Sequence, residues 1–157
     1  MADEGLSPYT KRELAQVAKA FTAMGDAAVN EARSVAGKLA EYALGEIKQA
    51  GYQRTKSNKT IRRVVDGATI SKSSKTGRIQ LGFARQRLSG GGNTQQVWGG
   101  LEFGDPFGKY KQFPTWSGKY GAGSRGWFIY PTLRKIQPEL TKKWEEAASQ
   151  IVKKWTA

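Results

Sequence analysis

The chain has 157 residues and contains neither cysteine nor histidine. Without cysteine the protein has no disulfides, no thiol nucleophile and no cysteine-ligated zinc site. Without histidine it lacks the commonest general base and metal ligand near neutral pH. Glu102 and Asp105 lie close enough in sequence to share a metal ion, but two carboxylates beside a glycine turn are a weak signal. We therefore expect a binding or structural protein with no catalytic residues, no cofactor and no metal site.

Long apolar runs are also missing. The longest uninterrupted run, from Trp127 to Tyr130, has four residues, whereas a transmembrane helix needs roughly 20. Residues 1–4 (Met-Ala-Asp-Glu) are acidic and have no apolar core, unlike a signal peptide. A length of 157 residues suits one domain, so we expect a single domain over 1–157 with no membrane partner.

Carboxylates are scarce, with 13 Asp and Glu against 26 Lys and Arg, and the excess of cations is uneven. Residues 1–52 carry six basic and seven acidic side chains, whereas residues 53–90 carry ten basic side chains and only one carboxylate, Asp66. Such a field favours DNA, another polyanion or an acidic neighbouring subunit. A solvated surface that keeps the protein soluble explains the charges equally well, and both interpretations stay open. The residues predicted to contact a DNA channel or polyanion are Arg54, Lys56, Lys59, Arg62, Arg63, Lys72 and Lys75.

Apolar residues recur every three or four positions from about Glu13 to Ala50, and again from Pro131 to the end of the chain. This spacing predicts a long N-terminal helix and a C-terminal helix. Gly25 is a candidate for a bend in the first helix. Pro138 is expected to kink the second helix or to restart it.

The middle of the chain changes to the period of strands. Ile79, Leu81 and Phe83 alternate with polar or small residues, which predicts a strand over 78–83 with one buried face. Residues 64–70 and 97–103 predict two further strands. We therefore expect an α+β fold, in which the long N-terminal helix and the C-terminal helix pack on a small, mainly antiparallel sheet with long glycine-rich loops. The expected core residues beside the long helix are Leu81, Phe83, Phe128, Leu133, Leu140 and Trp144.

Two segments, 53–63 and 104–126, are predicted to be extended loops. In the second, aromatic residues are spaced three or four apart, but Pro106, Pro114 and several glycines argue against a helix. Lysines between the rings would let the loop stack single-stranded bases. The same composition suits a loop that becomes ordered against another subunit, and we favour this interpretation. The predicted subunit-interface residues are Phe107, Tyr110, Phe113, Trp116 and Tyr120.

The order of these elements, together with two short motifs, resembles the tail-completion or head–tail joining (neck) proteins of long-tailed bacteriophages. One motif is a strand that ends in Glu-Phe-Gly, matched by residues 102–104. The other is an aromatic-proline-leucine entry into the C-terminal helix, matched by Phe128, Pro131 and Leu133. The resemblance implies a non-enzymatic α+β subunit of the virion, made in the host cytoplasm and located at the head–tail junction. It also implies a homo-oligomeric ring around the double-stranded DNA channel, in contact with neighbouring connector and tail proteins.

Two other functions stay open. A sequence-nonspecific nucleic-acid-binding protein that acts alone would be a small species with strongly salt-dependent affinity, whereas a ring former has a discrete large mass. A tail-terminator ring would use the same chemistry one position further along the particle.

Overall fold

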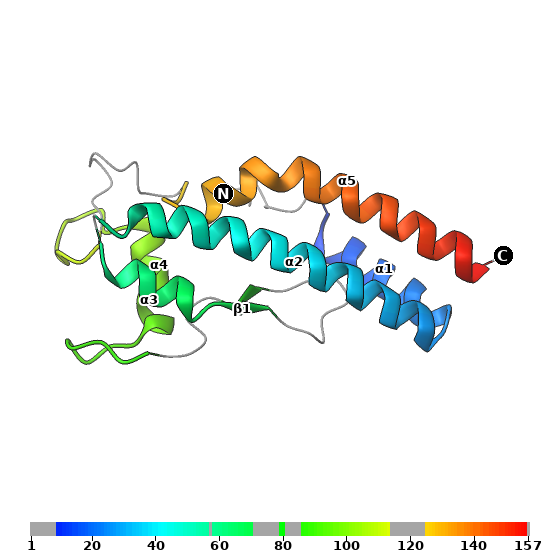
Figure 1. The fold of residues 1–157 in the computed structure, drawn as a ribbon, viewed down its shortest axis with the longest axis horizontal. Coiled ribbons are helices and arrows are strands. Elements are labelled where there is room, and N and C mark those ends of the chain that lie inside the picture. Colours follow the sequence, from blue (N-terminus) through cyan, green and yellow to red (C-terminus); the bar gives the residue numbers. More distant parts are fainter. Residues whose placement is uncertain (1–8, 57, 71–78, 81–85, 114–124, 157) are drawn as a thin grey trace. The chain divides into compact units, whose positions relative to one another are not determined.

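The computed structural model describes residues 9–56, 58–70, 79–80, 86–113 and 125–156, and helices account for 71% of these residues (Figure 1). This part of the chain contains five helices and two short strands. In chain order they are α1 (Lys11–Ala23), α2 (Asp26–Arg54), α3 (Thr60–Asp66), β1 (Thr69–Ile70), β2 (Ile79–Gln80), α4 (Thr94–Phe103) and α5 (Ile129–Thr156).

The predicted α+β fold is wrong, because the described residues are mostly helical. The strand predicted over 64–70 begins inside α3, and the strand predicted over 97–103 belongs entirely to α4. Of the strand predicted over 78–83, the structure describes only β2, and Leu81 and Phe83 lie outside the described residues. β1 and β2 have two residues each and pair with one another.

The start of α4 explains why residues 97–103 are helical. The side chain of Asn93 accepts hydrogen bonds from the backbone N–H groups of Gln95 and Gln96, at 3.0 and 3.2 Å. The Gln96 side chain in turn accepts from the Asn93 N–H at 3.1 Å. This capping box supplies acceptors to donors that a helix N-terminus leaves unpaired. It outweighs the preference of Val97 and Trp98 for strands.

In α3 the pattern of burial decides between helix and strand. Ile61, Val64 and Val65 are all fully buried. Steps of three and four residues place these side chains on one face of a helix, whereas in a strand the neighbours Val64 and Val65 would point to opposite faces. The helix therefore buries all three at once.

The predicted long N-terminal helix is divided into α1 and α2. Gly25 lies between them with a φ of 103°, in the left-handed region that favours glycine. α1 begins at a capping box formed by Thr10 and Glu13. The apolar stripe continues across the break, so periodicity alone does not show where one helix ends.

The C-terminal helix was placed correctly, but its course differs at one proline. α5 runs through Pro138 as one helix and does not restart there. Pro131 lies in its first turn, where the missing backbone donor is not needed.

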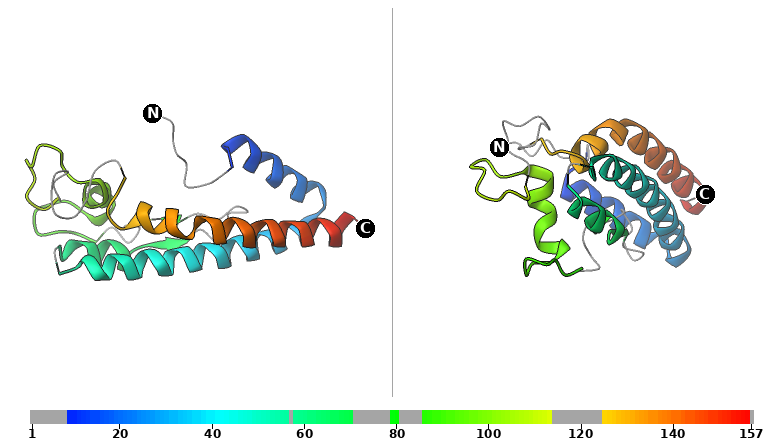
Figure 2. Two further views of the ribbon diagram at one scale, coloured as in Figure 1. Left: turned by 90° about the horizontal axis from the view of Figure 1, so that it is seen from above. Right: turned by 60° about the vertical axis from the view of Figure 1, so that its left-hand side comes forward.

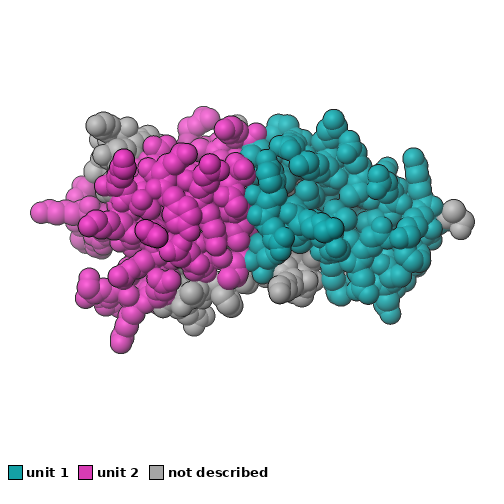
Figure 3. Space-filling view, in the orientation of Figure 1, with its two compact units in different colours: residues 1–42, 70–78, 136–157 teal, residues 43–69, 79–135 magenta. Residues whose placement is uncertain are grey.

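The chain forms two compact units, shown in Figure 3. Unit 1 comprises residues 1–42, 70–78 and 136–157, and unit 2 comprises residues 43–69 and 79–135. Each unit has its own apolar core, so the predicted single core is divided. Phe128 and Leu133 belong to the core of unit 2, whereas Trp144 packs in unit 1.

The core of unit 1 is built around Phe21, which is 2% exposed. The edge of the Trp144 ring packs against it, with ring centroids 6.1 Å apart and an interplanar angle of 85°. Ala28, Ala32 and Ile151 complete the contact between α1, the first part of α2 and the later part of α5. These small alanines let the helices approach closely.

The core of unit 2 joins the end of α2 to α3, α4 and the start of α5, and α3 and α4 lie against each other (Figure 2). Gly51 marks the closest approach. A Cβ atom there would lie 2.7 Å from Cγ1 of Val65 and 3.3 Å from the Phe128 ring. Glycine therefore lets α2 meet both neighbours.

Candidate functional site

Five of the seven residues predicted to contact a polyanion are described, and all five are exposed. They follow one stretch of unit 2, from the last residue of α2 to the middle of α3. The apolar face of α3 is buried, which directs Arg62 and Arg63 outward. Lys72 and Lys75 lie outside the described residues. The five exposed cations are Arg54, Lys56, Lys59, Arg62 and Arg63.

The contacts of α3 leave most of this charge available. Nε of Arg62 lies 3.8 Å from Oδ2 of Asp66, a loose ion pair one helical turn away. Nη1 of Arg63 donates to the backbone carbonyl of Arg87 at 3.4 Å, which brings a sixth exposed cation to this face. Sequence reasoning missed Arg87, because only the fold brings it beside α3.

Exposed charge is distributed unevenly between the two units. Among the described residues of unit 2, ten cations are exposed and Asp66 is the one exposed carboxylate. Among those of unit 1, nine cations and six carboxylates are exposed. The exposed cations of unit 2 are Arg54, Lys56, Lys59, Arg62, Arg63, Arg87, Lys109, Lys111, Arg125 and Lys135.

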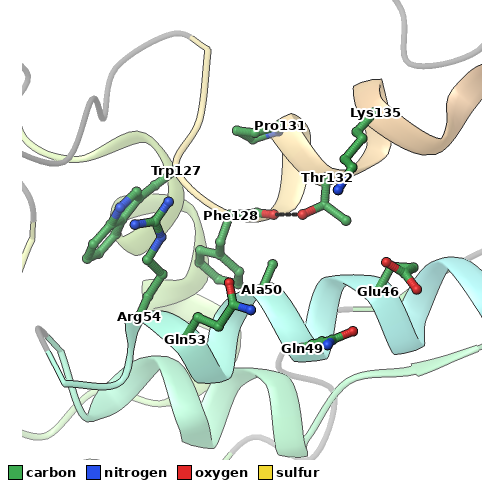
Figure 4. Close-up of a pocket in the computed structure, with 10 residues that line it drawn as sticks. All are labelled: Glu46, Gln49, Ala50, Gln53, Arg54, Trp127, Phe128, Pro131, Thr132 and Lys135. Atoms are coloured by element: carbon green, nitrogen blue, oxygen red, sulfur yellow. Dashed lines mark hydrogen bonds between the residues drawn. The ribbon is translucent and has the colours of Figure 1, made fainter.

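A groove of about 320 Å³ lies within unit 2, between the end of α2 and the start of α5 (Figure 4). The Arg54 guanidinium lies over the Trp127 ring, 5.7 Å from its centroid, and Lys135 and Glu46 lie further along (Figure 4). A guanidinium held on an aromatic face is well placed to bind a carboxylate or phosphate in two-point contact. The remaining lining residues are Gln49, Ala50, Gln53, Phe128, Pro131 and Thr132.

Glu102 is fully buried at the end of α4, yet it is not free to act on a ligand. Its carboxylate accepts hydrogen bonds from the backbone N–H groups of Phe128, Ile129 and Tyr130, at 2.9, 2.9 and 2.8 Å. These are the donors that the start of α5 leaves unpaired, at the positive end of the helix dipole. Burial raises the pKa of Glu102, and the backbone donors oppose that rise.

Asp105 is also committed to backbone donors. Its two oxygens accept from the N–H groups of Phe107 and Tyr110, at 3.0 and 2.8 Å. These hydrogen bonds hold the pKa of Asp105 below its usual value. Glu102 and Asp105 are therefore used separately, to cap a helix and to fold a loop. No group of three or more acidic residues suited to a metal ion occurs among the described residues.

The two motifs that carry the phage resemblance meet in space. Glu102 caps the helix that begins beside Phe128, and the Phe103 ring packs against Tyr130 with centroids 5.1 Å apart. Gly126 fits closely below the carboxylate, with a φ of 78°. The segment 102–104 therefore positions the entry into the C-terminal helix.

The predicted interface aromatics differ in their surroundings. Phe107 and Tyr110 are exposed. Phe113 is half-buried and packs against the core of unit 2, over Gly100. Trp116 and Tyr120 lie outside the described residues.

Comparisons with protein-family models, with curated proteins and with solved structures found no match to this chain. None of the helices in the described part of the chain combines the length and apolar character that a membrane span requires.

Proposed function

We propose that this protein is a non-enzymatic structural subunit of a phage head–tail connector or tail end, which assembles into a ring around the DNA channel and joins head to tail. Its place is the head–tail junction of the virion, beside other connector and tail proteins. The observation that carries the proposal is the concentration of exposed cations in unit 2, where Asp66 is the one exposed carboxylate among the described residues.

This charge suits a channel through which duplex DNA passes. Duplex DNA carries about one negative charge per 1.7 Å of its axis, and lysine and arginine attract its phosphates without reading sequence. The cations lie on a helix end, a turn and a seven-residue helix, α3. They are spread along a surface and do not converge on a pocket, which favours contact with a long polyanion.

The second support is the contact between segment 102–104 and the start of α5. The α+β fold that the resemblance implied is wrong for this chain, so the fold class does not support the family. The two motifs remain, and they are joined through Glu102. Their contact gives both motifs a common structural role, in one helix entry.

Charge removal tests the DNA contact. The variant in which Lys56, Lys59, Arg62 and Arg63 are all changed to Gln should fold normally but bind duplex DNA more weakly, most clearly at low salt. Every phosphate that the variant no longer neutralises should reduce the slope of log affinity against log salt by about 0.9. The matched control changes four exposed lysines of unit 1, which lowers the net charge equally: Lys11, Lys19, Lys142 and Lys153.

Equal losses of affinity in the two variants would assign the effect to net charge alone and remove the basis for a channel surface. Electron microscopy of the particle, with the chain located in its density, then separates the remaining functions. A position at the neck or the tail end supports a connector or a terminator ring. Absence from the particle, with DNA binding retained, supports a free nucleic-acid-binding protein.

A further inference from the structure

The loop that follows α4 presents an apolar ring to solvent. The Phe107 side chain is 92% exposed, and Tyr110 beside it is 48% exposed. A phenylalanine or tyrosine that becomes buried removes some 150–250 Å² from water. The large apolar surface of these two residues is therefore available for a partner.

This loop is folded rather than merely exposed. Asp105 accepts from the N–H groups of Phe107 and Tyr110, and the Phe113 N–H donates to the Tyr110 carbonyl at 3.0 Å. Phe113 then anchors the loop over Gly100 of α4. Because the backbone is already fixed, little conformational entropy is lost when Phe107 enters an interface.

The charge around the loop defines the chemistry of the partner. Lys109 and Lys111 are exposed, whereas Asp105 is buried and uses both oxygens within the loop. The loop therefore presents an apolar and cationic surface. A complementary surface is apolar and acidic.

Unit 1 of this chain offers such a surface on α5. Val152 and Trp155 are 41% and 37% exposed. Glu31 lies beside them and accepts from Trp155 Nε1 at 3.0 Å and from Lys154 Nζ at 3.1 Å, which holds its pKa below the usual value. Glu145 precedes Val152 by two helical turns on the same face, about 10 Å away at 1.5 Å per residue.

We infer that Phe107 and Tyr110 of one copy pack on Val152 and Trp155 of the next copy, with the loop lysines near the carboxylates. The inference rests on the proposed ring, because a ring needs two different faces on each subunit. It names those faces, one in unit 2 and one in unit 1. Phe107 is the anchor of the contact.

The absence of cysteine from the chain allows a direct test. Full-length Phe107→Cys and Val152→Cys proteins, made with tags of different length, are mixed at a concentration where the wild type sediments as an oligomer, and are oxidised with diamide. Disulfides form only where Cα atoms come within about 7 Å. We expect mixed dimers from the two variants and none from either variant alone. The double variant should give a ladder of larger species.

Tyr52→Cys is the matched control for Val152→Cys, because Tyr52 is 42% exposed. Mixed with Phe107→Cys, it should give no dimer. Phe107→Ala should weaken wild-type self-association at least tenfold, the effect typical of an interface anchor. Lys109→Ala should have a smaller effect that disappears at high salt.

Dimers of Phe107→Cys with itself would indicate a two-fold contact and overturn the inference. Absence of mixed dimers would also overturn it, whether the wild type is an oligomer or a monomer. The proposed function stands or falls separately, on the position of the chain in the particle. A ring that shows no mixed dimer would keep the function and remove this contact.

Discussion

The carboxylate of Glu102 accepts a hydrogen bond from the backbone N–H of Ile129 at 2.9 Å, which ties the end of α4 to the first residue of α5. Two neighbouring N–H groups bond to the same carboxylate. A buried carboxylate is costly unless donors surround it, and the start of a helix provides several. Glu102 thus fixes the direction in which α5 leaves the loop.

Removing this carboxylate should destabilise unit 2. Glu102→Ala leaves three backbone donors without their acceptor and opens a cavity, so we expect a loss of about 3 kcal/mol or more in the free energy of unfolding. Glu102→Gln keeps one acceptor oxygen and should lose less. Urea unfolding followed by circular dichroism measures both. Glu139→Gln is the control, because Glu139 is exposed and should change stability little. Equal stability of all three variants would show that the cap is dispensable.

The sequence predicted the terminal helices and the basic surface because both depend on local pattern. Repeats of three and four mark α1, α2 and α5, and runs of lysine and arginine remain on the surface. The middle of the chain was predicted wrongly because Val64, Val65 and Val97 favour strands in isolation. In the protein, burial on one face and the Asn93 cap decide for helix.

Long-range contacts could not be predicted. Glu102 and Arg54 each meet residues around 127–130, far along the chain, and no local pattern announces such pairs. Asp105 was noticed as a carboxylate, but its use in a turn became evident only from its two backbone donors. A signal was present in that case, since aspartate before a Pro-x-Gly sequence is common in turns.

Two adjacent glycines of α4 should respond oppositely to alanine. A Cβ atom at Gly100 would lie 2.5 Å from the Phe113 ring, whereas nothing lies within 4 Å of one at Gly99. Gly100→Ala should displace Phe113, loosen the loop that carries Phe107 and lower stability. Gly99→Ala should raise stability by up to about 1 kcal/mol through helix propensity. Thermal unfolding and hydrogen exchange of residues 104–113 measure the two effects. Similar behaviour of both variants would mean that Phe113 does not pack on α4.

The contact between Phe21 and Trp144 should account for much of the stability of unit 1. Phe21→Ala should cost about 3–5 kcal/mol, because the ring is almost fully buried. Trp144→Ala should cost less, because that side chain is only half-buried. Phe107→Ala, at an exposed position, should leave the free energy of unfolding of the free subunit unchanged. In a double-mutant cycle, the two rings should show a coupling of about 0.5–1.5 kcal/mol. Strictly additive losses would place the rings in independent environments.

The hydroxyl of Tyr9 donates to Glu145, and this contact should be visible in a titration of tyrosine absorbance. Burial, with help from the nearby carboxylate, raises the pKa of Tyr9 from 10.0 to about 12. The folded chain therefore holds the phenol proton more tightly than the unfolded chain. The resulting stabilisation is complete below pH 10 and is lost as the pH rises from 10 to about 12. Tyr9→Phe should remove one tyrosine from the steps at highest pH. Glu145→Gln should move the Tyr9 step back toward 10, whereas Glu146→Gln, an exposed neighbour, should leave it in place. A Tyr9 step at its ordinary pKa in the wild type would show that Tyr9 and Glu145 do not meet in solution.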